Sequence, residues 1–102
     1  MTHYELSKDA QADLKEVARY TIKHWGRQQL NLYRQGLKET FHAIGNGSVV
    51  ERQFSESFPQ LRVTKYRHHY IFYIKNDESK PIIIGVIHER RDVVNQLAKR
   101  LG

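Results

Sequence analysis

The sequence 61-LRVTKYRHHYIFYIKNDESKPIIIGVIH-88 decides the fold, because β-branched and aromatic residues make up nearly all of its runs Tyr70–Ile74 and Ile82–Ile87. Residues Leu61–Tyr66 alternate with a period of two, the pattern of a strand that turns one face toward a core. Residues Tyr70–Lys75 and Ile82–His88 are more uniformly apolar, which suits central strands. The segments between these runs are short enough for hairpin links. The stretch therefore predicts an antiparallel meander.

Two amphipathic helices precede this meander. Over Lys8–Trp25 apolar residues recur at steps of three and four, and the hydroxyl of Ser7 can cap the first turn. Residues 30–44 repeat the same spacing. Gly26, between the two runs, supplies a left-handed residue that closes the first helix. The pattern predicts an αα-hairpin.

Short elements at both ends complete the predicted fold. Residues His3–Leu6 read as a short strand, and Asp92 can cap a last helix over Val93–Leu101. Residues 46–59 are polar and irregular. The order β-α-α-β-β-β-α predicts an α+β fold, with the N-terminal hairpin and the other helix packed on one face of an antiparallel sheet. The length predicts a single domain over residues 1–102.

The composition is that of a folded domain with an uneven charge distribution. The chain has no Cys, which excludes disulfides and thiolate chemistry. Its apolar runs are far shorter than the ~20 residues of a membrane span and its first residues are polar, so we expect a cytoplasmic protein without a signal peptide. Residues 1–51 hold seven basic and six acidic residues, and residues 52–102 hold ten and five. The second half thus carries most of the field that attracts an anionic partner.

The sequence offers little for metal or cofactor chemistry. His68 and His69 are adjacent and would point to opposite sides of a strand, and His24 and His42 lie on different helices, so the spacing is not that of metal ligands. The chain has no Gly-rich phosphate loop and no Gly-x-Ser-x-Gly elbow. We expect no metal, no cofactor and no small-molecule substrate.

A set of basic residues on and after the strands is the candidate partner-binding site: Arg62, Lys65, Arg67, Arg90 and Arg91. Tyrosines are interleaved with them, and the combination suits a nucleic acid or an acidic peptide. The alternative is a solvated sheet edge with half-buried tyrosines. Arg90 and Arg91 are the stronger candidates, because they lie between Glu89 and Asp92 at a strand-to-helix corner.

Four segments together resemble the ParE branch of the RelE/ParE toxins: 18-ARYTIKHWG-26, 61-LRV-63, 69-HYIFY-73 and, most specifically, 87-IHERRD-92. The resemblance covers nearly the whole chain. It implies a toxin, not itself an enzyme, that inhibits DNA gyrase and traps its cleaved DNA complex. It also implies a ParD-like antitoxin. An apolar groove between helical hairpin and sheet, beside the basic half of the chain, would accept an acidic amphipathic tail of such a partner.

Two other functions remain open from the sequence. RelE-like relatives are ribosome-dependent mRNA endonucleases, and Arg62, Lys65, Arg90 and His88 would carry that chemistry here. Such enzymes typically keep a Tyr or a His-Tyr pair near the C-terminus, whereas no Tyr follows Tyr73, so the ParE reading is favoured. A nucleic-acid-binding module without chemistry is the third reading, and direct DNA binding by the isolated chain is not expected.

Overall fold

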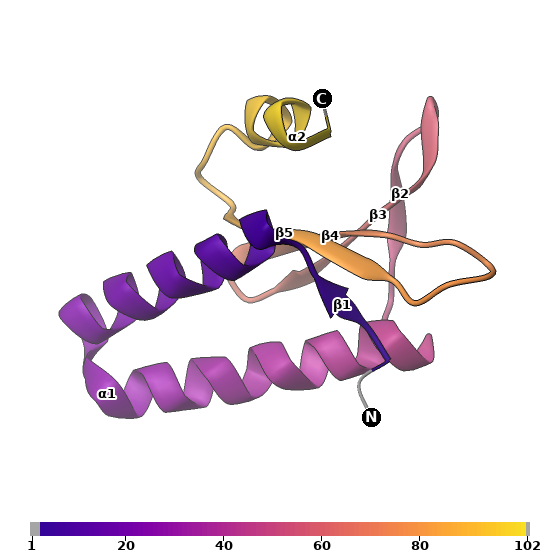
Figure 1. The fold of residues 1–102 in the computed structure, drawn as a ribbon. Coiled ribbons are helices and arrows are strands. Elements are labelled where there is room, and N and C mark those ends of the chain that lie inside the picture. Colours follow the sequence, from indigo (N-terminus) through magenta and orange to yellow (C-terminus); the bar gives the residue numbers. More distant parts are fainter. Residues whose placement is uncertain (1–2, 102) are drawn as a thin grey trace.

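The computed structural model describes residues 3–101, which form a five-stranded sheet with helices on both faces (Figure 1). In chain order the elements are β1 (Glu5–Leu6), α1 (Lys8–Asn46), β2 (Arg52–Ser55), β3 (Phe58–Tyr66), β4 (His69–Ile74), β5 (Ile82–His88) and α2 (Val93–Leu101). The strands lie in the order β1-β5-β4-β3-β2. The predicted α+β architecture is confirmed. Within residues 3–101, no helix combines the length and apolar character needed to cross a membrane.

Helix α1 is a hairpin of two antiparallel arms, residues 8–25 and residues 27–46, joined at Gly26 (Figure 1). The Ser7 hydroxyl accepts a hydrogen bond from the Ala10 amide at 3.1 Å and caps the first arm. Gly26 has φ 87° and ψ 174°, a conformation that side-chain-bearing residues avoid. The predicted αα-hairpin is confirmed, and its turn is made by one non-helical residue.

Strands β3, β4 and β5 form the predicted antiparallel meander, with Tyr66 opposite His69 and His69 opposite His88. Strand β1 departs from the antiparallel prediction because it runs parallel to β5, to which it is joined by a long crossover through α1 and the other strands. The sequence analysis missed β2, whose residues RQFS include one apolar side chain and so show no alternation. Pairing with β2 also extends β3 back from Leu61 to Phe58.

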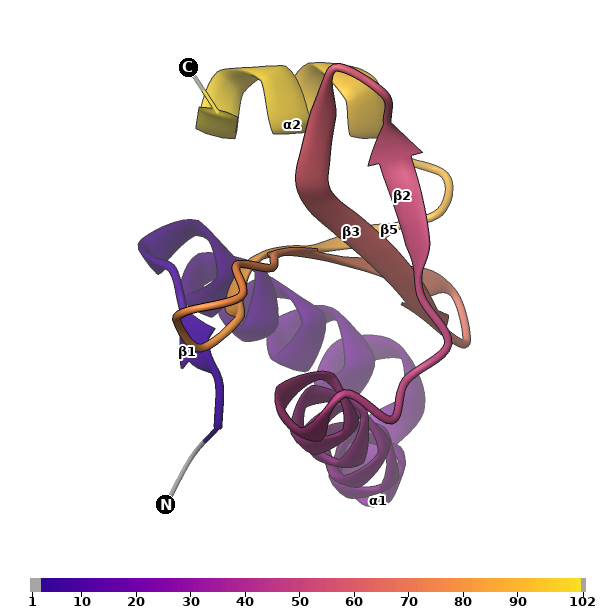
Figure 2. The same ribbon diagram turned by 90° about the vertical axis from the view of Figure 1, so that its right-hand side faces the viewer.

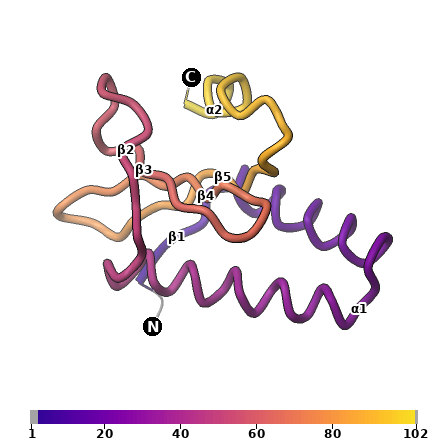
Figure 3. Tube along the Cα trace, turned by 180° about the vertical axis from the view of Figure 1, so that it is seen from behind, coloured from indigo at the N-terminus to yellow at the C-terminus, as the bar shows by residue number. Residues whose placement is uncertain are grey.

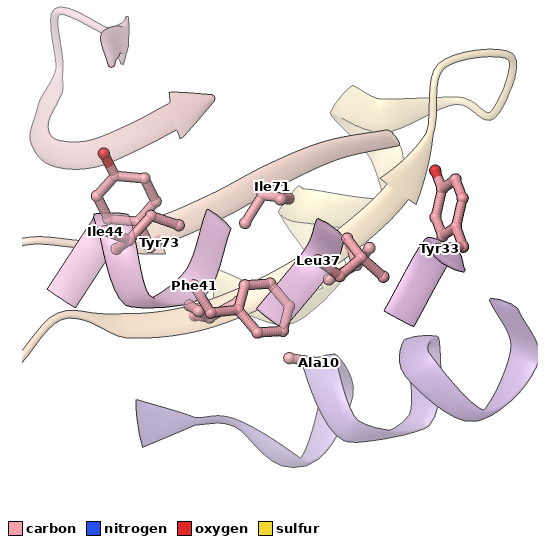
Figure 4. Close-up of a cluster of buried hydrophobic side chains, with 9 residues drawn as sticks. Ala10, Tyr33, Leu37, Phe41, Ile44, Ile71 and Tyr73 are labelled. Carbon is pink, nitrogen blue, oxygen red and sulfur yellow. The ribbon is translucent and has the colours of Figure 1, made fainter. Parts of the chain in front are cut away.

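The two faces of the sheet hold separate hydrophobic cores. Helix α1 covers one face, where the buried residues are Ala10, Tyr33, Leu37, Phe41, Ile44, Ile71, Tyr73, Ile83 and Val86 (Figure 4). Helix α2 covers the other face, where the buried residues are Leu61, Val63, Phe72, Ile84, Ile87 and Leu97 (Figure 2). The hairpin packs on one face of the sheet as predicted, but the expectation that the last helix packs on the same face is wrong. Strands β4 and β5 are apolar on both sides, so each side needs a cover.

An ion pair between Asp13 of α1 and Arg100 of α2 joins the two helices across β5. The guanidinium donates to both carboxylate oxygens, at 2.6 and 2.9 Å, and both side chains are largely buried. Asp13 also accepts the Val86 amide at 2.8 Å, while Arg100 donates to the Ile84 carbonyl at 3.1 Å. These backbone groups lie on the part of β5 beyond its pairing with β1. A Cβ at Gly85 would lie 2.7 Å from Nη1 of the guanidinium, so this glycine leaves room for the pair.

We predict that Arg100→Met lowers the free energy of unfolding by about 3 kcal/mol, because the Asp13 carboxylate is left nearly buried without its countercharge. Urea unfolding followed by circular dichroism measures the change. Arg91→Met is the matched control, since Arg91 is exposed and makes no ion pair within residues 3–101; its effect should stay within about 0.5 kcal/mol. Equal stability of the two variants would show that the pair does not hold the helices together.

Candidate partner-binding surfaces

A groove of about 560 Å³ runs between the two arms of α1 and is bordered by β1. Its apolar lining comes from Leu6, Leu14, Val17, Ala18, Leu30, Leu37 and Phe41, with Tyr4 and Tyr33. Several of these side chains also belong to the core that α1 makes with the sheet. The groove is therefore a shallow opening onto the hydrophobic core.

Four cations from both arms also line this groove: Lys15, Arg19, Arg34 and Lys38. Its lining within residues 3–101 includes no carboxylate, and none of the four cations takes part in an ion pair there. A polypeptide segment with apolar side chains on one face and acidic ones on its flanks would match this surface. We call it the basic groove.

The sequence analysis expected a groove between the hairpin and the sheet, whereas this groove lies between the two arms of the hairpin, and its four cations were not assigned to a binding site. The sequence analysis summed the charge over each half of the chain. In the first half, acidic residues elsewhere nearly cancel the positive charge of these cations. The signal that could have found them is spacing. Lys15 and Arg19, like Arg34 and Lys38, are four residues apart, so each pair shares one side of its arm.

A second surface forms where the β3–β4 turn meets the end of β5, and we call it the sheet end. The Glu89 amide donates to the His68 carbonyl at 2.8 Å, which ties the two segments together. Lys65 lies near the end of β3 and Arg67 lies in the β3–β4 turn, while Arg90 and Arg91 lie in the turn after β5. Four of the five predicted site residues are thereby brought to one end of the sheet.

Arg62 is the predicted site residue that does not belong there. Its guanidinium donates to Glu51 at 3.1 Å and to the Pro59 carbonyl at 2.9 Å. The same carboxylate accepts Tyr73 at 2.8 Å and Lys75 at 3.3 Å. Burial, reinforced by the hydrogen bond to Glu51, raises the pKa of Tyr73. Arg62 therefore helps to anchor the segment before β2, a structural role.

The four basic residues at the sheet end differ in how firmly they are held. Lys65 lies 3.4 Å from Glu89 and 5.2 Å from the centre of the Tyr70 ring. Arg67 has φ 51° and donates to the hydroxyl of Tyr66 at 3.2 Å. The side chains of the remaining two, Arg90 and Arg91, are exposed and form no ion pair within the described part of the chain. These two are the cations most available to a partner.

Histidines gather at the sheet end because the register places His69 opposite His88. Their rings meet edge to face at 5.1 Å, and the Tyr33 hydroxyl is hydrogen-bonded to Nδ1 of His69. Burial, followed by the charges of His88 and His68, lowers the pKa of His69 to about 4, and burial raises the pKa of Tyr33 to about 12. At neutral pH the imidazole of His69 is therefore neutral and the phenol of Tyr33 is protonated.

The other two histidines of this cluster, His68 and His88, form hydrogen bonds with different partners. Nδ1 of His68 lies 2.9 Å from Glu89, and Nδ1 of His88 accepts the Arg90 amide at 3.1 Å. The rings of His68 and His69 both lie near the ring of His88, at 6.2 and 5.1 Å, and the sequence did not reveal this cluster because it depends on strand register. Residues 3–101 contain no group of three or more His, Cys, Asp or Glu arranged to hold a metal ion.

Comparisons with known proteins identify the family of the chain. The family model described as "ParE toxin of type II toxin-antitoxin system, parDE" matches residues 4–93. Toxin ParE of Escherichia coli is 35% identical over 99% of this chain and 98% of its own length. Toxin ParE1 of Mycobacterium tuberculosis is 32% identical over 94% of this chain and 98% of its own.

Among solved structures, a chain titled "Chromosomal ParDE TA system from P. aeruginosa" has the same fold. The TM-score is 0.69 at 15% identity, and the match covers 86% of this chain and 96% of that one. Family match and fold together define the class, a toxin of a type II toxin–antitoxin system. The chain belongs to the ParE toxin family, which confirms the resemblance seen in residues 18–26, 61–63, 69–73 and 87–92.

We predict that stability rises with pH between about 4 and 6.5, the folded and ordinary pKa values of His69. The unfolded chain binds this proton more readily, so acidification favours unfolding and the contribution is fully present above pH 6.5. The free energy of unfolding should be about 1–2 kcal/mol lower at about pH 5.5 than at neutral pH.

His69→Gln keeps a hydrogen-bonding partner for Tyr33 but does not titrate, and it is the matched control. Urea unfolding at both pH values should show a flatter profile for this variant. A pH dependence identical to that of the unsubstituted protein would mean that His69 is not the responsible group.

Proposed function

We propose that this protein is a gyrase-directed toxin, not itself an enzyme, that stabilises the cleaved gyrase–DNA state and is neutralised by a ParD-like antitoxin. Family membership supports the proposal. The observation that carries the antitoxin half is the basic groove, with an apolar floor and four cations that form no ion pair with any residue from 3 to 101. An acidic amphipathic segment gains affinity by burying its apolar anchors there and gains orientation from charge pairing.

In the gyrase half of the proposal, gyrase contacts a surface of this chain other than the basic groove. Arg90 and Arg91 are exposed at the sheet end, on a turn between β5 and α2. The groove lies between the arms of α1. We therefore propose the sheet end for gyrase.

We predict that reversing charge along the basic groove weakens antitoxin binding. Arg19→Glu with Arg34→Glu should raise the Kd for a purified acidic ParD-like partner, encoded beside this chain, by roughly 10- to 100-fold, with slower association. Calorimetry and stopped-flow mixing measure the two effects. Lys80→Glu with Lys99→Glu makes the same charge change at exposed positions outside both surfaces and should alter Kd less than about threefold. Equal losses of affinity in both variants, or no binding of the unsubstituted chain at low and moderate salt, would contradict the antitoxin proposal.

We predict that the purified chain, gyrase, ATP and supercoiled plasmid together yield linear DNA after detergent and protease. Arg90→Ala with Arg91→Ala should reduce the linear product by roughly tenfold, because truncation of a central arginine is typically costly. Lys80→Ala with Lys99→Ala is the control and should leave it unchanged. Linear DNA must depend on both proteins, and its absence with a folded sample contradicts the gyrase proposal.

A ribosome-dependent endonuclease is the second candidate, and one observation favours it. Lys65, Arg90 and His88 share the sheet end, although Arg62 lies apart in its pairing with Glu51. This candidate requires messenger RNA cuts in a translating extract. It also requires their loss on His88→Ala, with His68→Ala as the neighbouring control.

A further inference from the structure

The outer part of the α1 hairpin, residues 19–35, carries charge of one sign and is called the hairpin tip. It holds Arg19, Lys23, Arg27 and Arg34 and no acidic residue. The nearest carboxylates along the chain are Glu16 and Glu39, and no tip cation forms an ion pair within residues 3–101. The tip extends away from the sheet at the end opposite to β1 (Figure 3). Its positive field is therefore not compensated locally.

The tip also exposes large aromatic and apolar side chains to solvent. Every residue from 22 to 29 is exposed, and the exposed fractions of Trp25, Leu32 and Tyr20 are 69%, 61% and 59%. The rings of Tyr20 and His24 lie 4.2 Å apart. Side-chain amides fill much of the remaining surface, at Gln28, Gln29, Asn31 and Gln35.

Cations, amides and exposed aromatic rings are the side chains that contact nucleic acids. Arg and Lys neutralise phosphates, and Asn and Gln donate to phosphates and base edges, contacts that a duplex offers along its whole backbone. An acidic peptide would use apolar anchors along the groove. Lys23 and Arg27 are not among the residues that line the groove, and Lys23 follows the groove residue Arg19 by four positions, so it continues the row of Lys15 and Arg19 toward the tip. The cationic surface thus extends beyond the groove, which favours a polyanion over an amphipathic peptide.

We propose that the hairpin tip binds the phosphate backbone of duplex DNA directly. This goes beyond the proposed function, in which gyrase holds the DNA, and it does not depend on gyrase. It also revises the expectation that the isolated chain does not bind DNA. Counting by halves balanced the tip cations against acidic residues such as Asp9, Asp13 and Glu16, which lie outside the tip.

The test is fluorescence anisotropy of a labelled duplex of about 20 base pairs with the full chain, from about 50 to 200 mM salt. The unsubstituted chain should bind at the lowest salt and weaken steadily as salt rises. Lys23→Gln with Arg27→Gln should lower affinity at least about tenfold and reduce the salt slope by roughly 1.8, about 0.9 for each lost phosphate contact. Lys80→Gln with Lys99→Gln removes the same charge elsewhere and should change neither quantity.

Three outcomes would overturn the proposal. The first is no binding of the folded chain at the lowest salt, and the second is equal losses from the two double variants. The third is competition by unlabelled polyglutamate as effective as that by unlabelled duplex, which would identify the tip as a site for acidic polypeptides. Circular dichroism confirms folding of each variant, and substitution of exposed tip residues should leave it intact.

Discussion

The Asp13–Arg100 ion pair connects the parts of this fold that the sheet alone would leave separate. Helices α1 and α2 lie on opposite faces of the sheet, and each covers its own hydrophobic cluster. The pair reaches past β5, satisfies the Val86 amide and the Ile84 carbonyl, and closes the region that the two-residue strand β1 does not reach. Unpaired backbone groups at this depth would be costly. One charged contact thus fixes the position of both layers relative to the central strand.

This arrangement separates the surfaces available to partners. Packing of α1 against the sheet uses the inner sides of its arms and leaves the basic groove between them. The register of β3, β4 and β5 brings the β3–β4 turn beside the end of β5, which creates the sheet end. The hairpin tip shares Arg19 and Arg34 with the basic groove and extends beyond it, whereas the sheet end is separate from both. A small protein can in this way present several basic surfaces without placing them together.

Periodicity was enough to predict the hairpin, the meander and the last helix, because each has a clear repeat of apolar residues. It could not predict β2, whose short polar segment becomes a strand only by pairing with β3. It could not place α2 on the far face either, since Leu97 indicates a buried side but not which sheet face receives it. Among the site residues, Lys65, Arg67, Arg90 and Arg91 gather as a strand-end cluster, whereas Arg62 pairs with Glu51. The basic groove needed the three-dimensional pairing of arms that are far apart in sequence.

The single-residue turn at Gly26 has a consequence for local unfolding. Between the buried residues Thr21 and Leu30 every side chain is exposed, so this end of the hairpin is secured mainly by its own helical hydrogen bonds. The opposite end is held by the core and by Arg100. Opening should therefore begin at the turn and decrease in frequency toward the sheet, so that amide exchange is fastest near Gly26 and slowest beside Asp13. The hairpin would then have a gradient of rigidity, stiff where it packs on the sheet and compliant at its far end.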